Sequence, residues 1–203
     1  LVRIQYDPQK LILDMQNKFV LAFCFFIILS CSNESESNDS EPSSTNNNGT
    51  VEIYLINSLD DSRGYCLDIV GYKENANVNK GLQSHSCYSY QGQISIDQGF
   101  DKGKISEKEF YIPHFKVCME ADSIQESSSL DLKTCDKNEK QKFILQTNGK
   151  INPESNLNLC LTVSKNSREG GGGTPVHLIR DLSLQICDES LSAYQKWGTR
   201  KSN

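Results

Sequence analysis

Hydrophobic residues are distributed unevenly along this chain of 203 residues. One continuous apolar block lies near the N-terminus, and everything after it is polar with short hydrophobic runs. These runs are rich in β-branched and aromatic residues and are separated by Asn, Gly, Ser and Asp, a pattern typical of strands and turns. Sustained amphipathic helical periodicity is not evident. We therefore expect an all-β fold, with an opening strand over residues 51–56.

The apolar block has the organisation of an export signal. Lys18 supplies the positive charge, and the apolar run from Phe19 to Leu29 is too short to cross a bilayer as a helix, which needs about 20 residues. The sequence Ile-Leu-Ser-Cys that ends at Cys31 resembles a bacterial lipobox, in which the cysteine is lipidated. An ordinary secretory signal that contains a cysteine, or a buried core helix, is the alternative.

The lipobox divides the N-terminal region into segments. We expect a lipoprotein signal peptide over residues 15–30, translation that begins at Met15, and residues 1–14 that are never made. The segment 31–50 carries no large apolar side chain after the cysteine, so we expect a lipidated residue followed by a disordered tether. Ser32 and the acidic residues that follow it are similar to surface-export signals, which predicts an outer-membrane lipoprotein at the cell surface.

Residues 51–203 contain three copies of one unit, marked by four landmarks that recur in the same order. The first is a cysteine that opens a short apolar strand: Cys66–Ile69, Cys118–Ala121 and Cys160–Val163. The second is a strand from leucine to cysteine: Leu82–Cys87, Leu130–Cys135 and Leu182–Cys187. The third is Gln-x-aromatic: Gln98–Phe100, Gln141–Phe143 and Gln195–Trp197. The fourth is Gly-Lys-Ile: Gly103–Ile105 and Gly149–Ile151.

A threefold repeat of this length restricts the architecture. Three blades would not close a propeller, whereas three units of four strands close a β-trefoil, a six-stranded barrel capped by three hairpins. The paired cysteines, the Cys-Leu-Asp-Ile sequence and the Gln-x-Trp/Phe triplets look like the ricin-type β-trefoil lectin repeat, over most of residues 51–203. The resemblance implies that the aromatic residue of each triplet packs in the core and that the glutamine amide joins backbone segments through hydrogen bonds.

Six of the eight cysteines belong to the three units, since Cys24 and Cys31 lie in or beside the apolar block. The six form no C-x-x-C pair, and the three histidines are dispersed, so we expect no metal site and no cofactor. Disulfides are expected in an exported chain. Repeat equivalence selects one pairing within each unit: Cys66–Cys87, Cys118–Cys135 and Cys160–Cys187.

The resemblance also implies candidate sugar-binding positions. In the family, an acid two residues after the first cysteine accepts hydrogen bonds from sugar hydroxyls, a ring near the second cysteine stacks on the sugar, and a polar residue before the glutamine adds a further bond. The first unit offers Asp68, His85, Asp97 and Gln98. The second unit offers Glu120, Lys133 and Lys140 as a possible secondary site. The third offers Thr162, Gln185 and Tyr194, a set that has lost the acid.

Each of these assignments has an alternative. Asp68 could instead cap local backbone N–H groups, and His85 could serve packing alone. Tyr88 and Tyr90 follow the second cysteine closely, so either could be the stacking ring. Asp97 stands where the family has Asn, which removes a donor.

Charge and motif content restrict the function. The net charge is −5 and no basic tract is present, which excludes nucleic acid as an expected partner. No catalytic signature occurs, and the glycine-rich run 169–174 lacks the Lys/Ser pair of a phosphate loop, so it is expected to be a flexible insertion in a non-enzyme. We expect a monomer whose partner is a glycan or glycoprotein, with membrane contact through the lipid alone. The alternative is a protein-interaction module with degenerate sugar sites.

Overall fold

The structure is a computed structural model, and it describes residues 49–201. The expected signal peptide, the lipidated Cys31 and nearly all of the tether lie outside the described residues. The first strand, β1 (Thr50–Leu55), begins one residue before the expected start of the domain. Among the described residues, every helix is too short or too polar to span a bilayer.

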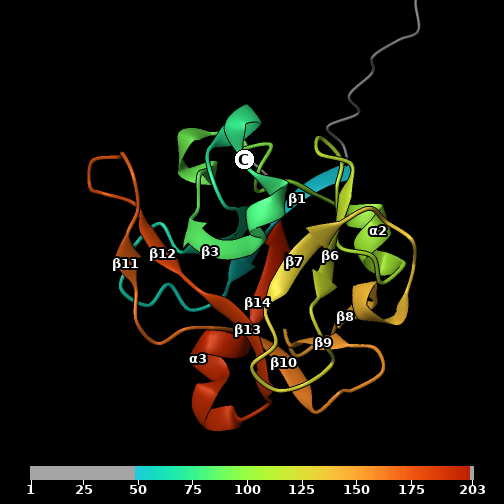
Figure 1. Ribbon diagram of the computed structural model, residues 1–203. Coiled ribbons are helices and arrows are strands. Elements are labelled where there is room, and N and C mark those ends of the chain that lie inside the picture. Colours follow the sequence, from blue (N-terminus) through green and yellow to red (C-terminus); the bar gives the residue numbers. More distant parts are fainter. Residues whose placement is uncertain (1–48, 202–203) are drawn as a thin grey trace, which may run out of the picture. The chain divides into compact units, whose positions relative to one another are not determined.

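Six short strands surround the core (Figure 1). They are β1, β4 (Phe100–Asp101), β5 (Tyr111–Ile112), β8 (Phe143–Leu145), β9 (Ile151–Pro153) and β14 (Trp197–Arg200). Strand β1 pairs with both β14 and β4, and β8 pairs with β9. Two isolated bridges, Glu109 with Lys142 and Lys150 with Lys196, join β5 to β8 and β9 to β14. Strands β4 and β5 are in contact without a ladder between them, and the six strands follow the ring expected of a trefoil barrel.

Three antiparallel hairpins complete the units. They are β2 (Tyr65–Ile69) with β3 (Leu82–Ser86), β6 (Val117–Ala121) with β7 (Leu130–Lys133), and β10 (Leu159–Val163) with β13 (Leu182–Ile186). Each hairpin coincides with the first two sequence landmarks of its unit, which confirms the expected strands. The connections hold short helical turns: η2 (Lys73–Asn75), η3 (Val78–Lys80), η4 (Ser89–Gln91), α2 (Lys102–Ser106), η5 (Glu139–Gln141), η6 (Glu189–Leu191) and α3 (Ser192–Gln195).

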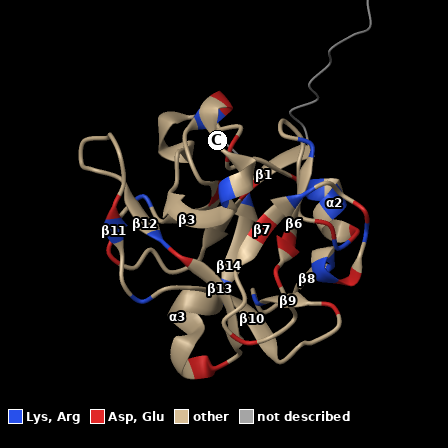
Figure 2. Ribbon diagram, in the orientation of Figure 1, with Lys and Arg blue, Asp and Glu red and all other residues tan. Residues whose placement is uncertain are grey.

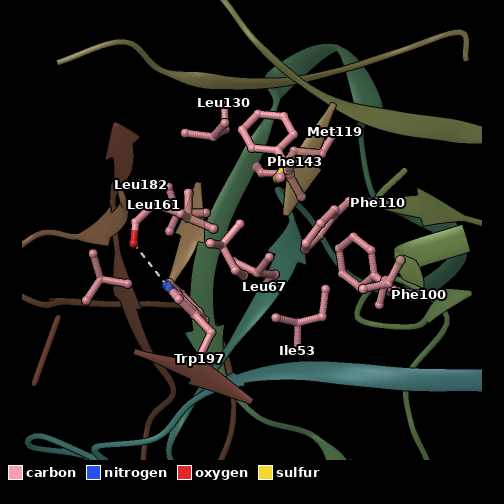
Figure 3. Packing of buried hydrophobic residues seen from close by; sticks show 14 of the residues in the cluster. Ile53, Leu67, Phe100, Phe110, Met119, Leu130, Phe143, Leu161, Leu182 and Trp197 are labelled. Atoms are coloured by element: carbon pink, nitrogen blue, oxygen red, sulfur yellow. Dashed lines mark hydrogen bonds between the residues drawn. The ribbon is translucent and has the colours of Figure 1, made fainter. Parts of the chain in front are cut away.

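The aromatic residues of the three triplets pack in one core, as expected (Figure 3). Phe100, Phe143 and Trp197 are fully buried. Phe110 stands edge-on to both phenylalanines, with ring centroids 6.5 and 6.0 Å away. The indole Nε1 of Trp197 donates to the carbonyl of Leu161 at 3.0 Å, so its polar atom is satisfied inside the core.

The triplet glutamines make the same backbone bridge three times. In each, the side-chain oxygen accepts from the N–H that follows the second cysteine, and the amide nitrogen donates to the carbonyl that precedes it. The glutamines that do this are Gln98, Gln141 and Gln195. The bridge fixes each disulfide corner onto the following barrel strand, which explains why the triplet recurs.

The three disulfides are those expected: Cys66–Cys87, Cys118–Cys135 and Cys160–Cys187. Each joins the first strand of a hairpin to the residues just after the second strand. They span 21, 17 and 27 residues of sequence, so every bridge closes a loop within its own unit.

The glycine-rich insertion forms a hairpin of its own. Strands β11 (Arg168–Glu169) and β12 (Leu178–Arg180) pair with each other, and β12 also pairs with β3 of the first unit. The insertion of the third unit therefore extends the β2–β3 sheet of the first unit (Figure 1).

One landmark does not mark equivalent structures. Gly103–Ile105 lies in helix α2, whose first turn is capped by Asp101, which accepts from the N–H of Lys104 at 3.0 Å. In the second unit the same tripeptide begins at Gly149, a turn residue with φ of 87°, and runs into β9. A helix-capping carboxylate in one unit and a left-handed glycine in the other give the same three residues different conformations.

Candidate carbohydrate-binding site

The register of the β2–β3 hairpin assembles the first-unit site. Asp68 lies opposite Gln83, and Cys66 lies opposite His85. Because side chains alternate along a strand, these residues share one face of the hairpin, and Leu67 lies on the other face, in the core. The pairing therefore brings the expected acid and the expected ring to the same face.

Asp68 is fully buried, and its two carboxyl oxygens have different environments. Oδ2 accepts from the Nε2 of Gln83 at 3.1 Å, whereas Oδ1 has no donor with hydrogen-bond geometry among residues 49–201, although the amide of Gln98 and the N–H of Ile69 lie near enough to the carboxyl to oppose the rise in its pKa. Burial, followed by the nearby charge of Asp97, raises the pKa of Asp68 well above its ordinary value. Gln83 was not among the residues expected from the sequence, although a hairpin register in which Ile69 meets Leu82 would have placed it opposite the acid.

Asp97 organises the loops around the acid. Its Oδ2 accepts from the backbone N–H of Lys73 at 2.6 Å, and its Oδ1 accepts from the hydroxyl of Ser95. Lys73 has a φ of 47°, so the carboxylate holds a left-handed turn that opens η2. The two accepted bonds give a reason for aspartate in place of asparagine, because an asparagine side chain has one acceptor oxygen.

His85 lies beneath two other rings. Its centroid is 5.1 Å from that of Tyr88 and 5.0 Å from that of His177, which comes from the β11–β12 loop. Its Nδ1 lies 2.9 Å from the carbonyl of Ser86, and burial lowers its pKa. His85 is 3 % exposed and Tyr90 is 54 % exposed, so Tyr90 is the ring of this group that faces solvent.

Two cavities adjoin these rings. The first has a volume of about 520 Å³ and lies between η2 and the loop that follows η4; it is lined by Lys73, Glu74, Tyr88, Gln91, Gly92, Gln93, Ile94, Ser95 and Ile96. The second, of about 350 Å³, is lined by Tyr72, Tyr88, Tyr90, Gln91, Gly171, Gly172, Gly173 and His177. Both have volumes of the size of small-molecule sites. Tyr88 lines both cavities and packs on His85, so this ring separates the buried hairpin face from the open space.

Gln98 has a positioning role. Its Oε1 accepts from the N–H of Tyr88 at 3.0 Å and its Nε2 donates to the carbonyl of Ser86 at 3.2 Å. The amide therefore holds the segment that carries Tyr88. Neither Gln98 nor Asp97 is exposed, and their direct contact with a sugar remains a prediction.

The second unit satisfies its own acid. Oε2 of Glu120 accepts from Gln141 at 2.8 Å and from the Nδ2 of Asn138 at 2.9 Å, and Lys140 lies 3.8 Å from Oε1. Lys133, in the position of the ring, lies 3.6 Å from the carboxylate of Asp131. Two side-chain amides therefore donate to this carboxylate, whereas one donates to the carboxyl of Asp68.

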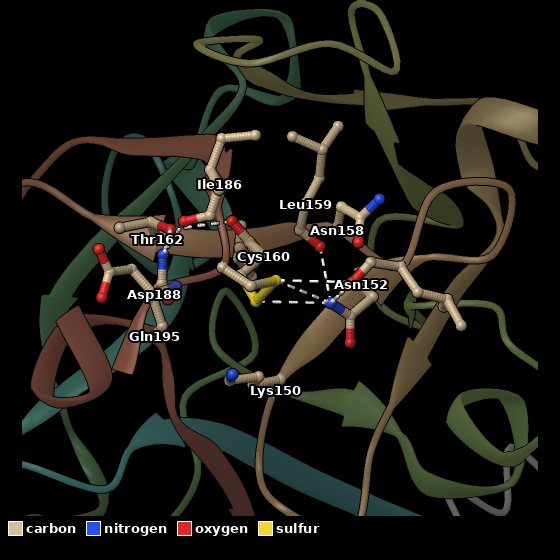
Figure 4. The surroundings of a disulfide bond; sticks show 12 residues. Lys150, Asn152, Asn158, Leu159, Cys160, Thr162, Ile186, Asp188 and Gln195 are labelled. Carbon is tan, nitrogen blue, oxygen red and sulfur yellow. Dashed lines mark hydrogen bonds between the residues drawn. A yellow bond between two sulfur atoms is a disulfide. The ribbon is translucent and has the colours of Figure 1, made fainter. Parts of the chain in front are cut away.

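The third unit has closed its site (Figure 4). Thr162, in the position of the acid, donates to the carbonyl of Cys160 at 2.8 Å and accepts from the Nε2 of Gln195 at 3.0 Å. Gln185 donates to the hydroxyl of Ser183, and Tyr194 is partly buried against the core. The described residues of this unit therefore hold no free acid at the position that the resemblance assigns to sugar binding.

Comparison with known proteins agrees with this geometry. Residues 52–197 match the family described as ricin-type beta-trefoil lectin domain. A search of curated proteins finds no match. Among solved structures, the mdaA-1 domain is 16 % identical, with a TM-score of 0.55 over 74 % of this chain and 88 % of that domain. The β-trefoil lectin of the Vibrio vulnificus hemolysin/cytolysin, solved with N-acetyl-D-lactosamine, is 17 % identical with a TM-score of 0.46, over 76 % of this chain and 96 % of that one.

The family match spans all three units and includes every disulfide. The ring of six strands and the three capping hairpins are the β-trefoil that the sequence predicts. The chain belongs to the ricin-type β-trefoil lectin family.

Proposed function

We propose that this protein binds carbohydrate without catalysing a reaction, and that the first unit holds its sugar site. The observation that carries the proposal is Oδ1 of Asp68, a buried acceptor without a hydrogen-bond donor among the described residues. Asp68 itself lines neither cavity; the ring of Tyr88, which packs on His85 of the same hairpin face, lines the cavity of about 520 Å³. A buried acceptor without a partner costs free energy, and a sugar hydroxyl is a donor that would satisfy it. In the other two units, Oε2 of Glu120 and the hydroxyl oxygen of Thr162 already accept from the triplet glutamines.

Tyr88 determines how a sugar reaches the acid. Its ring covers His85 and is itself 5 % exposed. Burial, followed by the charges of Asp68 and Asp97, raises the pKa of Tyr88. A rotation of this one side chain would connect the cavity with the face that holds Asp68 and Gln83. The sugar would then occupy the place that the Tyr88 ring now fills and would stack on the ring of His85.

The cavity lining suits a polyhydroxyl ligand. Lys73, Glu74 and Gln93 offer charged and amide groups to it, and the ring of Tyr88 forms an apolar wall. Hydroxyls pair with such groups, while the C–H face of a sugar lies on a ring. A binding module of this kind needs no cofactor or metal.

Binding to an array of immobilised glycans tests the proposal, with Asp68→Asn as the informative variant. Since Gln83 would keep its bond to the Asn oxygen, the Asn amide would place a donor where the free acceptor lies. We expect roughly tenfold weaker binding, because a mispaired buried group costs about 1–3 kcal/mol. Glu120→Gln is the matched control in the second unit, and we expect it to leave affinity unchanged.

The outcomes separate the hypotheses. If Asp68→Asn binds as the unaltered protein does, with an unaltered melting temperature, the first-unit site is wrong. If only Glu120→Gln loses binding, the site lies in the second unit. If the unaltered protein binds no glycan, the alternative of a protein-interaction module is favoured, and the burial of the acid position in all three units is the observation that would support it.

We propose further that the lectin domain is carried at the bacterial cell surface by lipid on Cys31. The support is the sequence: a short apolar run that ends in Ile-Leu-Ser-Cys, followed by a polar segment. Many anchored copies would compensate for a weak single site through avidity. Metabolic labelling with an alkyne fatty acid tests this. We expect label on the native chain and none on Cys31→Ser, and label that persists on the variant would contradict the assignment.

A further inference from the structure

The smaller of the two cavities is built by two different units. Tyr72, Tyr88 and Tyr90 come from the first unit, and His177 comes from the β11–β12 hairpin inserted in the third. The insertion reaches this position because Ile179 pairs with His85 across the β12–β3 ladder. The site therefore depends on an insertion that the other two units lack in the described part of the chain.

Charged side chains fix the insertion onto the first unit. The guanidinium of Arg63 donates to the carbonyls of Pro175 and Val176 at 2.9 and 2.7 Å. Arg180, which is 4 % exposed, pairs with Asp60 at 2.6 Å. Contacts on both sides of the hairpin hold its loop in one place, so the loop can act as a preformed wall.

The lining of this cavity is uncharged and ring-rich. Tyr72 and Tyr90 are two of the five large hydrophobic side chains that are exposed among the described residues. The hydroxyl of Tyr90 lies 3.3 Å from Nε2 of His177 and accepts from the amide of Gln91 at 2.8 Å. Loop residues 170–177 carry no charge, and Figure 2 shows this loop free of acidic and basic residues. Rings with polar edges fit a neutral pyranose, whose C–H face is apolar and whose rim carries hydroxyls.

The glycines keep the cavity open. A Cβ added at Gly171 would meet no atom within 4 Å, and the same holds for Gly172. A Cβ at Gly173 would lie 2.8 Å from Nε2 of His177, so a side chain there would displace that ring. The glycine run therefore leaves space above the rings and allows the close approach of His177, which gives the insertion a purpose beyond connection.

We propose that this cavity binds a second pyranose of the glycan whose first sugar occupies the Asp68 site, so that the ligand is an oligosaccharide. This inference rests on the proposed function. Tyr88 and Gln91 line both cavities, so the two spaces adjoin and consecutive sugars can occupy them. The lining itself holds no acidic or basic side chain, which favours a neutral second sugar, while Arg63 and Lys73 lie over the rings of Tyr90 and Tyr72 at 5.9 and 5.0 Å.

Titration calorimetry on the purified chain tests the subsite, with three ligand pairs: methyl galactoside and lactose, methyl mannoside and mannobiose, and methyl N-acetylglucosaminide and chitobiose. For the pair that binds, we expect the disaccharide to bind about tenfold more tightly. Tyr90→Ala should reduce this preference about three- to tenfold and leave the monosaccharide affinity unchanged. Gly171→Leu should also reduce the preference for the disaccharide and leave the monosaccharide affinity unchanged, because the leucine side chain would fill the cavity.

Leu157→Ala is the matched control, since Leu157 is an exposed apolar side chain that does not line the cavity. It should change neither affinity. If Tyr90→Ala weakens both ligands of a pair equally, or if the unaltered protein shows no preference for the disaccharide, the subsite is wrong while the proposed function stands. If the unaltered protein binds none of the six ligands and no arrayed glycan, both fail together.

Discussion

The side-chain amide of Gln83 donates to Oδ2 of Asp68 at 3.1 Å, directly across the β2–β3 hairpin. The bond holds the buried carboxyl in place and leaves Oδ1 free. Burial and the neighbouring Asp97 raise the pKa of Asp68, so ionising this carboxyl costs free energy in the folded protein, and a sugar hydroxyl that donates to Oδ1 would favour the ionised form. The Asp68 carboxyl, which offers an acceptor to the sugar, therefore also makes the stability of the protein depend on pH.

The folded protein holds the proton on Asp68 more tightly than the unfolded chain does. Its folded-state pKa is the higher of the two, so stability falls as pH rises from the ordinary range of a carboxyl towards the folded value. Asp68→Asn removes this loss. We expect the melting temperature of the variant, relative to the unaltered protein, to rise by a few degrees between pH 4 and pH 8.

Asp122→Asn is the control for this pH series, because Asp122 is exposed. The difference in melting temperature between this variant and the unaltered protein should stay constant across the pH series. If the Asp68→Asn difference is equally flat, the carboxyl is not held neutral in the folded state. Differential scanning calorimetry at four pH values gives the comparison.

The disulfides should contribute nearly equal amounts to stability. The loops span 17 to 27 residues, and loop-closure entropy assigns about 3–3.5 kcal/mol to each, with little dependence on length. Paired replacement of Cys118 and Cys135 by Ala should therefore lower the free energy of unfolding by about 3 kcal/mol, measured by urea denaturation.

Replacement of Cys160 and Cys187 by Ala should lower the free energy of unfolding somewhat more than replacement of Cys118 and Cys135. Nδ2 of Asn152 lies 3.4 and 3.3 Å from the two sulfurs, and these contacts would be lost with the bridge (Figure 4). Equal losses for the two pairs would show that the asparagine contributes nothing. A loss below about 1 kcal/mol for either would contradict the loop-entropy explanation.

Trp197 occupies the core position that phenylalanine occupies in the other two units. Trp197→Phe keeps most of the buried ring but leaves the carbonyl of Leu161 without its donor, so we expect a loss of about 1–2 kcal/mol. Trp197→Ala should cost about 3–5 kcal/mol. Urea unfolding followed by circular dichroism provides both values, and equal costs would show that the hydrogen bond outweighs ring burial.

The fold could be predicted from sequence because its causes are local and repeated. Cysteines, buried strand residues and Gln-x-aromatic triplets recur in each unit, and each has one physical role that it performs three times. The Gly-Lys-Ile tripeptide shows the limit of this reasoning. Its conformation depends on Asp101 in one unit and on the turn at Gly149 in the other, and the identity of the tripeptide sequences does not reveal this difference.

The site was less predictable because it depends on contacts between units. The resemblance identified Asp68 and His85, and the hairpin brings them to one face. It did not identify Gln83, and nothing local in the sequence indicates that His177, 92 residues beyond His85, covers that ring. The glycine run was expected to be only a flexible insertion. Strand β12, which follows it, pairs with β3, and no local pattern indicates this pairing because the two segments lie far apart in sequence.

The anchoring of that insertion can be tested through Arg180. Its guanidinium pairs with Asp60, donates to the carbonyls of Ser164 and Lys165, and lies 4.9 Å from the ring of Tyr65. Arg180→Met would leave those carbonyls without their donor, and we expect a loss of about 2 kcal/mol, since the partner carboxylate is partly exposed. We also expect the β11–β12 loop to become a site of limited proteolysis, because it would detach from β3 more often.

Arg168→Met provides the matched control in the same hairpin. Arg168 pairs with Asp181 at 2.8 Å, but both side chains are more than half exposed, so the pair should contribute little. We expect its cleavage rate and melting temperature to match those of the unaltered protein. If Arg180→Met is cleaved no faster than Arg168→Met, the ladder between Ile179 and His85 holds the insertion without the arginine, and the preformed wall of the second cavity depends on strand pairing alone.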